Sequence, residues 1–526
     1  MLLTEILPRA AAAYPEKIAL VCGSTKLSYR EVAGRVGRLV AALGARGVRP
    51  GERVALLHRN CHRALEAYFA AVHAAAVLVP LNYRLTPRDL AYILEDTDCR
   101  VLIADTAWAT LAADAIGQAR SRCEIIWSRP ADDDADEITD GYEAALASVN
   151  PASTLDPAVR ENDPVNIYYT SGTTGHQKGV VLTHRNIYSH ALSTIAELTL
   201  SDTDVWAHVA PMFHLADAWA TWAMTWVGAR HVMVGRFDPP HVLRTLDEEG
   251  VTVTNLIPTM LNDLMNAPDI TAYGYKSLRL LMSGGAPIAP GLVRRLIETF
   301  RCEYVQTYGL TETSPYLTFS LLKEHLRRLP PERQMDYRAK TGRAALGVKL
   351  RVIDEQGREV PPDGQTVGEI IAQGDRITPG YWKLPEATAE AFRDGWFHTG
   401  DLATIDAERY LNIVDRKKDA ILTGGELVFT TEVENALYEH PAVLEAAVIG
   451  LPDERWGEAV SAVVVLKSGA QATEAEIADH CRSRLASYKC PRSVEFIDAL
   501  PRTGSGKIFK KALRDRHGSG QDTKPQ

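Results

Sequence analysis

Apolar and polar positions alternate with two different spacings along the first hundred residues, and each spacing predicts one type of element. Ser28 and Glu31 form a capping box, and the apolar residues that follow recur every three or four positions until Gly44, which predicts an amphipathic helix. Residues 53–57 and 77–79 are short apolar runs that predict buried strands, with a further helix between them. Strands that alternate with helices predict an α/β fold with a largely parallel, doubly wound sheet.

A third helix is predicted to begin at Pro87. Thr86 precedes it as a cap, proline loses no needed N–H in the first turn, and Asp89 faces the positive end of the helix dipole. Doubly wound sheets bind ligands in crevices at the carboxyl ends of their strands. We therefore expect the binding residues in the loops that leave the strands.

The pattern changes after about residue 414, where a charged segment, 415–419, precedes a compact stretch. That stretch predicts a helix over 432–438, strands over 443–449 and 460–466, and a capping box at Thr473 and Glu476. A separate α+β domain of common size follows from this pattern. The predicted segments are a large domain over 1–415, a small domain over 416–516 and a disordered tail over 517–526.

Composition and charge narrow the class of protein. Of the 526 residues, 46% are hydrophobic and 24% are charged, which is ordinary for a globular chain with enough apolar material for large cores. Lys and Arg number 58 against 67 Asp and Glu, and the net charge of -9 is spread along the chain. No basic face indicates nucleic acid as a partner.

The cysteines and the apolar runs indicate in which cellular compartment the protein is expected. Seven scattered cysteines without a CxxC pair favour a reducing cytoplasm and argue against structural zinc. The start of the chain has no long apolar core typical of a signal peptide. The longest nearly apolar run, 67–80, is shorter than the ~20 residues that cross a bilayer, so no membrane span is expected.

A glycine- and hydroxyl-rich loop follows a predicted strand at 166–169. Its N–H and O–H groups and its one lysine are suited to the oxygens of a polyphosphate. The pattern is not Walker A, because no Gly-Lys-Ser or Gly-Lys-Thr closes it and a strand follows. A plain flexible connection is the alternative interpretation. The candidate phosphate-binding residues are Thr170, Ser171, Gly172, Thr173, Thr174, Gly175 and Lys178.

Three further segments carry candidate chemistry. Segment 306–313 offers an aromatic ring and a carboxylate that could stack a purine and hold Mg²⁺. Segment 395–402 offers an acid that could bind ribose hydroxyls. Segment 501–508 could present Lys507 on a loop with two glycines. Taken singly, each also fits a buried tyrosine, a solvated acid or an exposed lysine.

Eight motifs occur in one order along nearly the whole chain. They read YTSGTTGHQKGV, PMFH at 211–214, SGGAP at 283–287, QTYGLTET, GEI, GWFHTGDL, DRKKDAILTGGE from Asp415, and PRTGSGK. Together they resemble the adenylate-forming superfamily of acyl-CoA synthetases, luciferases and peptide-synthetase adenylation domains. The resemblance implies a large N-terminal domain of doubly wound sheets with a β-barrel-like subdomain, and a small mobile C-terminal domain.

The resemblance also implies an activity. In similar enzymes a carboxylic acid attacks the α-phosphate of ATP, pyrophosphate leaves, and coenzyme A captures the acyl-adenylate. It implies Lys507, Glu312 and His214 as catalytic residues, Glu312 and Thr170 near Mg²⁺, and Asp401 with Arg416 on the ribose. Lys507 would lie where negative charges converge. The further nucleotide-binding residues implied are Gly285, Ala286, Pro287, Gln306, Thr307, Tyr308 on the adenine, Gly309 and Thr311.

By the same resemblance the small domain pivots at Lys418 between two half-reactions. Rotation would withdraw Lys507 and bring in Gly424, Gly425 and Glu426, where coenzyme A approaches. Three residues depart from the common pattern. Gln177 replaces a proline in the phosphate loop, and Leu427 and Thr430 replace an asparagine and a proline, so the thiol acceptor is less firmly implied than adenylation.

The pocket for the acid is expected to be lined by His214, Asp217, Ala218, Gly284 and Gly285. Four large apolar side chains near them recur with helical spacing and are expected to pack in the core. They are Leu215, Trp219, Trp222 and Trp226. Asp217 and Met224 lie off this stripe and could face the substrate, although a solvated or capping Asp217 is the simpler interpretation.

The leading hypothesis is an ATP- and Mg²⁺-dependent acyl-CoA synthetase for a hydrophobic or aromatic carboxylic acid. A carrier-protein pantetheine or a nitrogen nucleophile is the alternative acceptor. A non-catalytic scaffold and a kinase are alternatives from other classes, and intact Lys507, Glu312 and Asp401 argue against the first. A homodimer is frequent among similar enzymes.

Overall fold

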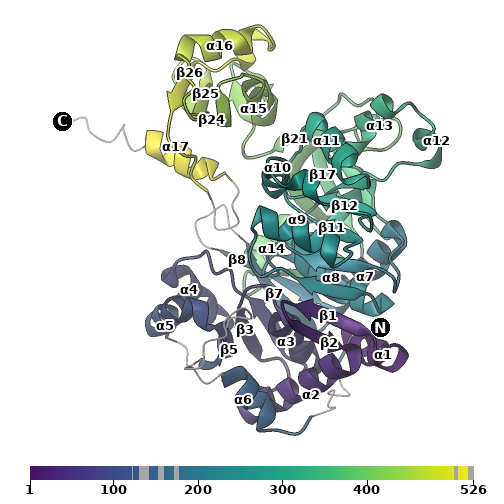
Figure 1. The fold of residues 1–526 in the computed structure, drawn as a ribbon. Coiled ribbons are helices and arrows are strands. Elements are labelled where there is room, and N and C mark those ends of the chain that lie inside the picture. Colours follow the sequence, from purple (N-terminus) through teal and green to yellow (C-terminus); the bar gives the residue numbers. More distant parts are fainter. Residues whose placement is uncertain (121–122, 130–140, 152–158, 171–176, 503–507, 519–526) are drawn as a thin grey trace, which may run out of the picture. The chain divides into compact units, whose positions relative to one another are not determined.

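The computed structural model describes residues 1–120, 123–129, 141–151, 159–170, 177–502 and 508–518 (Figure 1). The chain divides into two units. The large unit comprises Met1–Leu350 and Ala372–Phe397, and the small unit comprises Arg351–Ile371 and His398–Gln526.

The large unit contains two sheets. The nine-stranded sheet is parallel from β13 to β1, with antiparallel strands at both edges. Its order is β15 (Arg343–Ala344), β14 (Tyr316–Phe319), β13 (Glu303–Gly309), β12 (Leu280–Ser283), β11 (Val253–Asn255), β9 (Val205–His208), β10 (Arg230–Met233), β1 (Ile18–Cys22), β2 (Thr25–Ser28). The seven-stranded sheet has the order β18 (Gly380–Tyr381), β8 (Lys178–Thr183), β7 (Pro164–Thr170), β4 (Val77–Pro80), β3 (Arg53–Leu57), β5 (Cys99–Asp105), β6 (Glu124–Ser128).

Helices cover both faces of each sheet (Figure 1). The largest core packs apolar residues of both sheets against α1, α2, α3, α7 and α8. Helices α9, α10 and α11 cover the other face of the larger sheet, and α4 and α5 that of the smaller one. The helices are α1 (Ile6–Ala13), α2 (Tyr29–Ala45), α3 (His62–His73), α4 (Pro87–Thr97), α5 (Ala109–Gln118), α6 (Gly141–Ala147), α7 (His184–Leu198), α8 (Leu215–Val227), α9 (Pro239–Glu248), α10 (Pro258–Met265), α11 (Pro290–Phe300), α12 (Glu324–Arg327), α13 (Pro331–Arg338) and α14 (Pro385–Ala391).

The small unit has a different order of elements. A β-hairpin and two long strands form a sheet with β26, and α15 and α16 pack on it around buried valines and isoleucines. The elements are β21 (Leu411–Arg416), β22 (Ile421–Thr423), β23 (Glu426–Val428), α15 (Thr430–Tyr438), β24 (Val443–Asp453), β25 (Gly457–Leu466), α16 (Glu474–Arg482), β26 (Ser493–Phe496) and α17 (Lys510–Gly518). The strands β16 (Lys349–Ile353), β17 (Gly368–Gln373) and β20 (Trp396–Ile405) each have residues in both units, and the short β19 (Phe392–Arg393) lies in the large unit.

The local predictions can be compared with these elements. The capping boxes predicted at Ser28 and Thr473 are present, and Thr86 and Asp89 form a third. α15 begins two residues earlier than predicted, at Thr430. His517 and Gly518, assigned to the tail from the sequence, are the last residues of α17, and the other tail residues lie outside the described part.

Candidate active site

The predicted phosphate loop connects two antiparallel strands of the large unit. Thr170 ends β7 and lies opposite Lys178, the first residue of β8. The ammonium nitrogen of Lys178 lies 5.2 Å from the centre of the Tyr381 ring, which places the cation over an aromatic face. The predicted Ser171, Gly172, Thr173, Thr174 and Gly175 lie outside the described residues.

Glu312 lies beside this hairpin although it is distant in sequence. β18 pairs with β8 so that Tyr381 is opposite Val180, and the Tyr381 hydroxyl donates to Oε1 of Glu312 at 2.9 Å. The main-chain oxygen of Glu312 accepts from the N–H of Thr378 at 2.8 Å. Burial and the neighbouring carboxylate raise the pKa of Tyr381, so its hydroxyl stays protonated as the donor. Lys178, Tyr381 and Glu312 therefore form one polar cluster.

The turn after β12 lies against β13. The Thr307 hydroxyl donates to the Ser283 oxygen at 2.9 Å, and the Gln306 side-chain amide donates to the Ala286 oxygen at 3.0 Å. A Cβ on Gly284 would lie 2.4 Å from Oγ1 of Thr307, so only glycine fits there. Since β12 and β13 are parallel neighbours, their carboxyl ends lie side by side. The predicted nucleotide-binding residues that follow or end these strands therefore lie close together.

The remaining residues predicted near the nucleotide lie in the turn after β12, at the end of β13 and in the short helix that follows it. Gly285, Ala286 and Pro287 form an exposed turn. Tyr308 and Gly309 end β13, and a Cβ on Gly309 would overlap the main-chain oxygen of Pro315 at 1.8 Å. Thr311 begins the short helix η4 (Thr311–Thr313), which carries Glu312.

His214 immediately precedes α8, whose first turn holds Asp217 and Ala218. Asp217 is fully buried, and its carboxylate contacts His208 Nδ1 at 2.6 Å and accepts from the Trp206 indole N–H at 3.3 Å. The interpretation of Asp217 as a solvated or capping residue is therefore wrong. The sequence could not reveal its direction, because both partners lie on β9.

The contact of Asp217 extends into a buried chain of polar groups. His208 Nε2 lies 2.9 Å from His231 Nδ1, and His231 Nε2 lies 2.9 Å from the Thr225 hydroxyl. Burial raises the pKa of Asp217, against the effect of His208 and Trp206, and it lowers the pKa of His231 well below its usual value. Neither histidine was predicted from the sequence. A single histidine within an otherwise apolar strand was the available signal.

The predicted aromatic stripe packs in the core. Trp219 and Trp222 are buried against α3, α7 and the sheets, and the Trp219 ring meets Trp206 edge to face at 4.9 Å. Leu215 and Met224 are also buried, and Trp226 is partly buried. This prediction is confirmed.

In the small unit, Asp401 and Arg416 are cross-strand neighbours on β20 and β21. Arg416 Nε lies 3.5 Å from Asp401 Oδ1. Nearby, Glu369 lies 3.1 Å from Lys417 Nζ and 3.4 Å from His398 Nδ1. Burial alone would raise the pKa of Glu369. Its hydrogen bonds to Lys417 and His398, and its attraction to them, outweigh burial and hold the pKa below the usual value.

The residues predicted for the hinge and for coenzyme A follow along the chain. Lys418 lies in the turn after β21, and Gly424 and Gly425 form the tip of the β22–β23 hairpin with φ of 60° and 85°. Glu426 begins β23 and is exposed. The predicted Lys507 lies outside the described residues.

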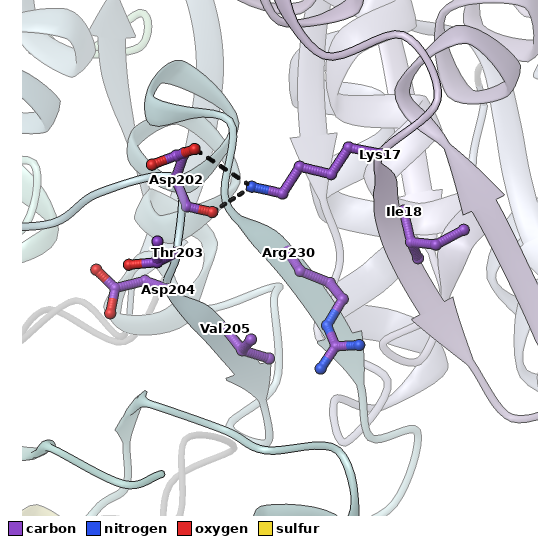
Figure 2. Close-up of a pocket in the computed structure, with 7 residues that line it drawn as sticks. All are labelled: Lys17, Ile18, Asp202, Thr203, Asp204, Val205 and Arg230. Carbon is purple, nitrogen blue, oxygen red and sulfur yellow. Dashed lines mark hydrogen bonds and ion pairs between the residues drawn. The ribbon is translucent and has the colours of Figure 1, made fainter.

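A pocket of about 400 Å³ lies at the amino ends of strands in the nine-stranded sheet, where β9 and β10 begin (Figure 2). Lys17 lies 3.9 Å from Asp202, Arg230 lies 3.8 Å from Glu249, and Asp204 pairs with Arg279 at 2.8 Å. Because these charges pair with one another at the amino ends of the strands, the pocket is not the candidate active site.

Comparison with known proteins decides the family. The family model described as AMP-binding enzyme matches residues 7–382, and the model of the AMP-binding enzyme C-terminal domain matches residues 432–507. The chain belongs to the AMP-binding enzyme family. It is similar to a long-chain-fatty-acid–CoA ligase of Thermus thermophilus, with 40% identity over 98% of this chain and 95% of the relative.

Two further similarities concern a relative and a solved structure. A feruloyl-CoA synthase of an Amycolatopsis species is 38% identical over 97% of this chain and 98% of its own. The crystal structure of ATP-bound MatB from Rhodopseudomonas palustris has a TM-score of 0.86 and 32% identity, covering 98% of this chain and 99% of that one. These findings confirm the predicted superfamily and the α/β fold with a large N-terminal and a smaller C-terminal domain.

This AMP-binding enzyme is an acid–thiol ligase. It uses ATP, Mg²⁺ and coenzyme A to convert a small carboxylic acid first into an acyl-adenylate, with release of pyrophosphate, and then into a thioester, with release of AMP. The predicted reaction and cofactors are confirmed. No helix among the described residues is long and apolar enough to cross a membrane.

The residues present fit magnesium bound together with a nucleotide. Glu312 and Thr170 offer oxygen atoms, which this hard cation prefers, and Mg²⁺ usually takes only one or two protein carboxylates beside substrate phosphates. Within the described part of the chain, no three His, Cys, Asp or Glu residues are placed to hold a metal by themselves.

Proposed function

We propose that the cluster of Lys178, Tyr381 and Glu312 is the phosphate end of the adenylation site. The observation that carries the proposal is the convergence of a cation, a hydroxyl and a buried carboxylate from three elements, next to the strand ends Thr170 and Lys178 that flank residues 171–176. The loop and Lys178 would bind the β- and γ-phosphates. Glu312, with Thr170, would hold Mg²⁺, which neutralises phosphate charge when bound.

The other site assignments are part of the same proposal. Tyr308 and the turn at 285–287 would hold the adenine, and Asp401 with Arg416 would bind the ribose. Gln306, Thr307, Gly309 and Thr311 would shape the nucleotide pocket. Their fixed hydrogen bonds support this role, because a binding wall must keep its shape when the substrate enters.

The chemical steps assign one role to each functional group. Lys507 would lie between the attacking carboxylate and the α-phosphate, where a fixed cation lowers the repulsion of two anions in the transition state. His214 would position the acid at the mouth of its pocket. In the second step Lys418 would act as the hinge, and Gly424, Gly425 and Glu426 would let the thiol approach the acyl-adenylate. The predicted domain boundary near residue 415 belongs to this proposal.

We infer that the acid is hydrophobic or aromatic. The first turn of α8 and the turn after β12 would form the pocket, with Asp217, Ala218, Gly284 and Gly285. The carboxylate of Asp217 already pairs with His208 and Trp206, so it offers the substrate no free charge. This favours an apolar acid over one that carries an amine, in agreement with the long-chain fatty acid and feruloyl substrates in the names of the two relatives.

We also propose a cytoplasmic location and a homodimer. None of the seven cysteines, all of which lie in the described part of the chain, forms a disulfide, and six of them are buried, which suits a reducing compartment. The homodimer rests on the family resemblance alone. Sedimentation of the purified protein tests it, and a monomer at micromolar concentration would contradict it.

The test of the proposed site is Lys507→Ala. Pyrophosphate release with ATP and acid should fall at least about 100-fold, whereas ATP binding should change little, since the lysine acts chiefly on the transition state. The substrate screen uses aliphatic, benzoic, cinnamic and amino-substituted acids, with and without coenzyme A. Normal turnover by Lys507→Ala would refute the assignment, and a preference for amino-substituted acids would refute the substrate class.

A further inference from the structure

The structure describes the residues on both sides of segment 503–507. Arg502 and Ile508 form an antiparallel bridge across it, and the N–H of Phe509 donates to the Pro501 oxygen at 2.7 Å. Arg502 forms an ion pair with Glu445 on β24. The chain is therefore fixed on both sides of the segment that carries Lys507.

Lys510, three residues after Lys507, attaches the first turn of α17 to α15. Its ammonium nitrogen lies 2.8 Å from Glu434 Oε1 and donates to the Thr430 hydroxyl at 2.6 Å. The side chains of Lys510 and Glu434 are each only 15% exposed, and Glu434 also accepts from the Val448 N–H at 2.9 Å. A charged bond this well shielded fixes direction more firmly than an exposed pair does.

Thr430 links this ion pair to the segment that precedes the predicted hinge. Its N–H and its hydroxyl both donate to Oδ2 of Asp415, the hydroxyl at 2.8 Å. A proline, common at this position in the similar motif, has neither donor. One turn further along α17, Arg514 forms an ion pair with Asp419. The departure at Thr430 thus has a structural role in this chain.

Apolar contacts also hold α17, at a position three residues after Lys510. Leu513 is buried with Ala447 and Ile449 of β24. These contacts fix the position of the helix on the sheet, as Figure 1 shows for α17 beside β24. The polar cluster of Lys510, Glu434, Thr430 and Asp415 holds the first turn, from which the chain continues back to Lys507.

We propose that Lys510 is a positioning residue for adenylation, which holds the chain on the C-terminal side of Lys507 in place through Glu434 and Thr430. The inference rests on the proposed role of Lys507. If the chain next to Lys507 can move, the lysine reaches the reacting phosphate less often, and small errors in position cost much of the rate. The second half-reaction does not use Lys507 and should not depend on Lys510.

The test compares the two half-reactions in five variants of the full-length enzyme. Lys510→Met should lower the rate constant of pyrophosphate release, with ATP and acid but without coenzyme A, about tenfold, whereas the KM for ATP changes less than about twofold. Thioester formation from supplied acyl-adenylate and coenzyme A should stay within about twofold. Lys510→Arg should restore most of the adenylation rate, since it keeps the cation.

Lys511→Met is the matched control, because Lys511 is the next residue of the same helix and is exposed. It should adenylate like the natural enzyme. Thr430→Val keeps the side-chain shape and removes one partner of Lys510, so it should give a smaller loss, about threefold. If Lys510→Met does not fold, the adenylation rate of Thr430→Val decides the test in its place.

Two results would overturn the inference. One is a natural adenylation rate in Lys510→Met, or in Thr430→Val where Lys510→Met does not fold. The other is an equal loss in both half-reactions without rescue by Lys510→Arg, which would mark a merely structural role. Lys507→Ala, measured beside them, separates the two proposals: its normal turnover would refute the proposed function itself, whereas an inactive Lys507→Ala beside an unaffected Lys510→Met would refute only the positioning role.

Discussion

The two units hold their functional groups in different ways. In the large unit, the first turn of α8 rests on a fully buried chain of polar groups that begins at Asp217 and includes two histidines. In the small unit, ion pairs such as that of Lys510 with Glu434 join the segments that carry the predicted hinge and the catalytic loop. The position of the functional groups in the large unit depends on buried hydrogen bonds. In the small unit it depends on ion pairs between segments that are separate along the chain.

This difference bears on what each unit contributes. Buried polar groups are costly to leave unpaired, so a network that is fully bonded fixes one arrangement of the pocket wall. The ion pairs of the small unit each join two particular segments of the chain, so the loss of one should act chiefly on the step that uses those segments. We therefore expect substitutions in the large unit to change stability first, and substitutions in the small unit to change one step of the reaction.

The largest effect should come from Asp217→Ala. The change removes the carboxylate that His208 and the Trp206 indole N–H contact, and each buried polar group left without its partner costs about 1–3 kcal/mol. The measurement is urea unfolding followed by tryptophan fluorescence, since Trp206 contacts the same carboxylate.

Asp479→Ala in the small unit is the matched control for this change. Its pair with Arg482 is largely exposed, at 71% and 61%, so the loss should stay below about 0.5 kcal/mol. Similar losses in both variants would remove the contrast between the units.

Acid should destabilise the large unit through its buried histidines, and His184 offers a single group to test. Burial lowers its pKa to about 4, and its Nδ1 accepts from the Leu3 N–H at 3.2 Å. Between pH 6.5 and 4 the unfolded chain binds one more proton than the folded chain. The stabilising contribution is therefore complete above about pH 6.5 and is lost as the pH falls, by about 1.4 kcal/mol per pH unit.

His184→Gln does not titrate and keeps an acceptor. The slope of unfolding free energy against pH should be smaller in this variant by about that amount between pH 6.5 and 4.5. Parallel curves for the variant and the natural protein would show that His184 is protonated in the folded state.

The sequence predicted what short-range contacts decide. The capping boxes at Ser28 and Thr473 depend on residues three positions apart, and the alternation of strands with helices depends on local apolar spacing. The strands on either side of the phosphate loop were predicted for the same reason. The motif residues, in contrast, were assigned through family resemblance, because no local pattern joins Thr170 to Glu312.

What the sequence could not show depends on partners distant along the chain. The hydrogen bond between Tyr381 and Glu312 requires that a two-residue strand at 380–381 pairs with β8, and no periodicity marks so short a strand. The inward direction of Asp217 depends on His208 from another strand. Thr430 was noted only as a departure, since its contacts with Asp415 and Lys510 arise from packing of the small unit.

The smallest effect should come from Gly424→Ala. Gly425→Ala, at the next residue of the same hairpin in the small unit, is the variant to compare with it. Both glycines have positive φ, so each alanine costs roughly 1 kcal/mol of backbone strain. A Cβ on Gly424 would also lie 2.7 Å from the Trp456 ring, whereas no heavy atom lies within 4 Å of one on Gly425. The guanidinium groups of Arg455 and Arg492, 4.7 and 4.5 Å from the ring centre, hold that ring in place.

If coenzyme A approaches at this hairpin, Gly424→Ala should slow thioester formation from supplied acyl-adenylate about fivefold, and Gly425→Ala about twofold. Pyrophosphate release without coenzyme A should differ little between the two variants, because adenylation does not use the hairpin. Stopped-flow measurement of each half-reaction separates these outcomes. Equal losses in the thioester step would mean that strain alone matters. A loss confined to adenylation would place the hairpin in the other half-reaction and contradict the division of labour proposed for the small unit.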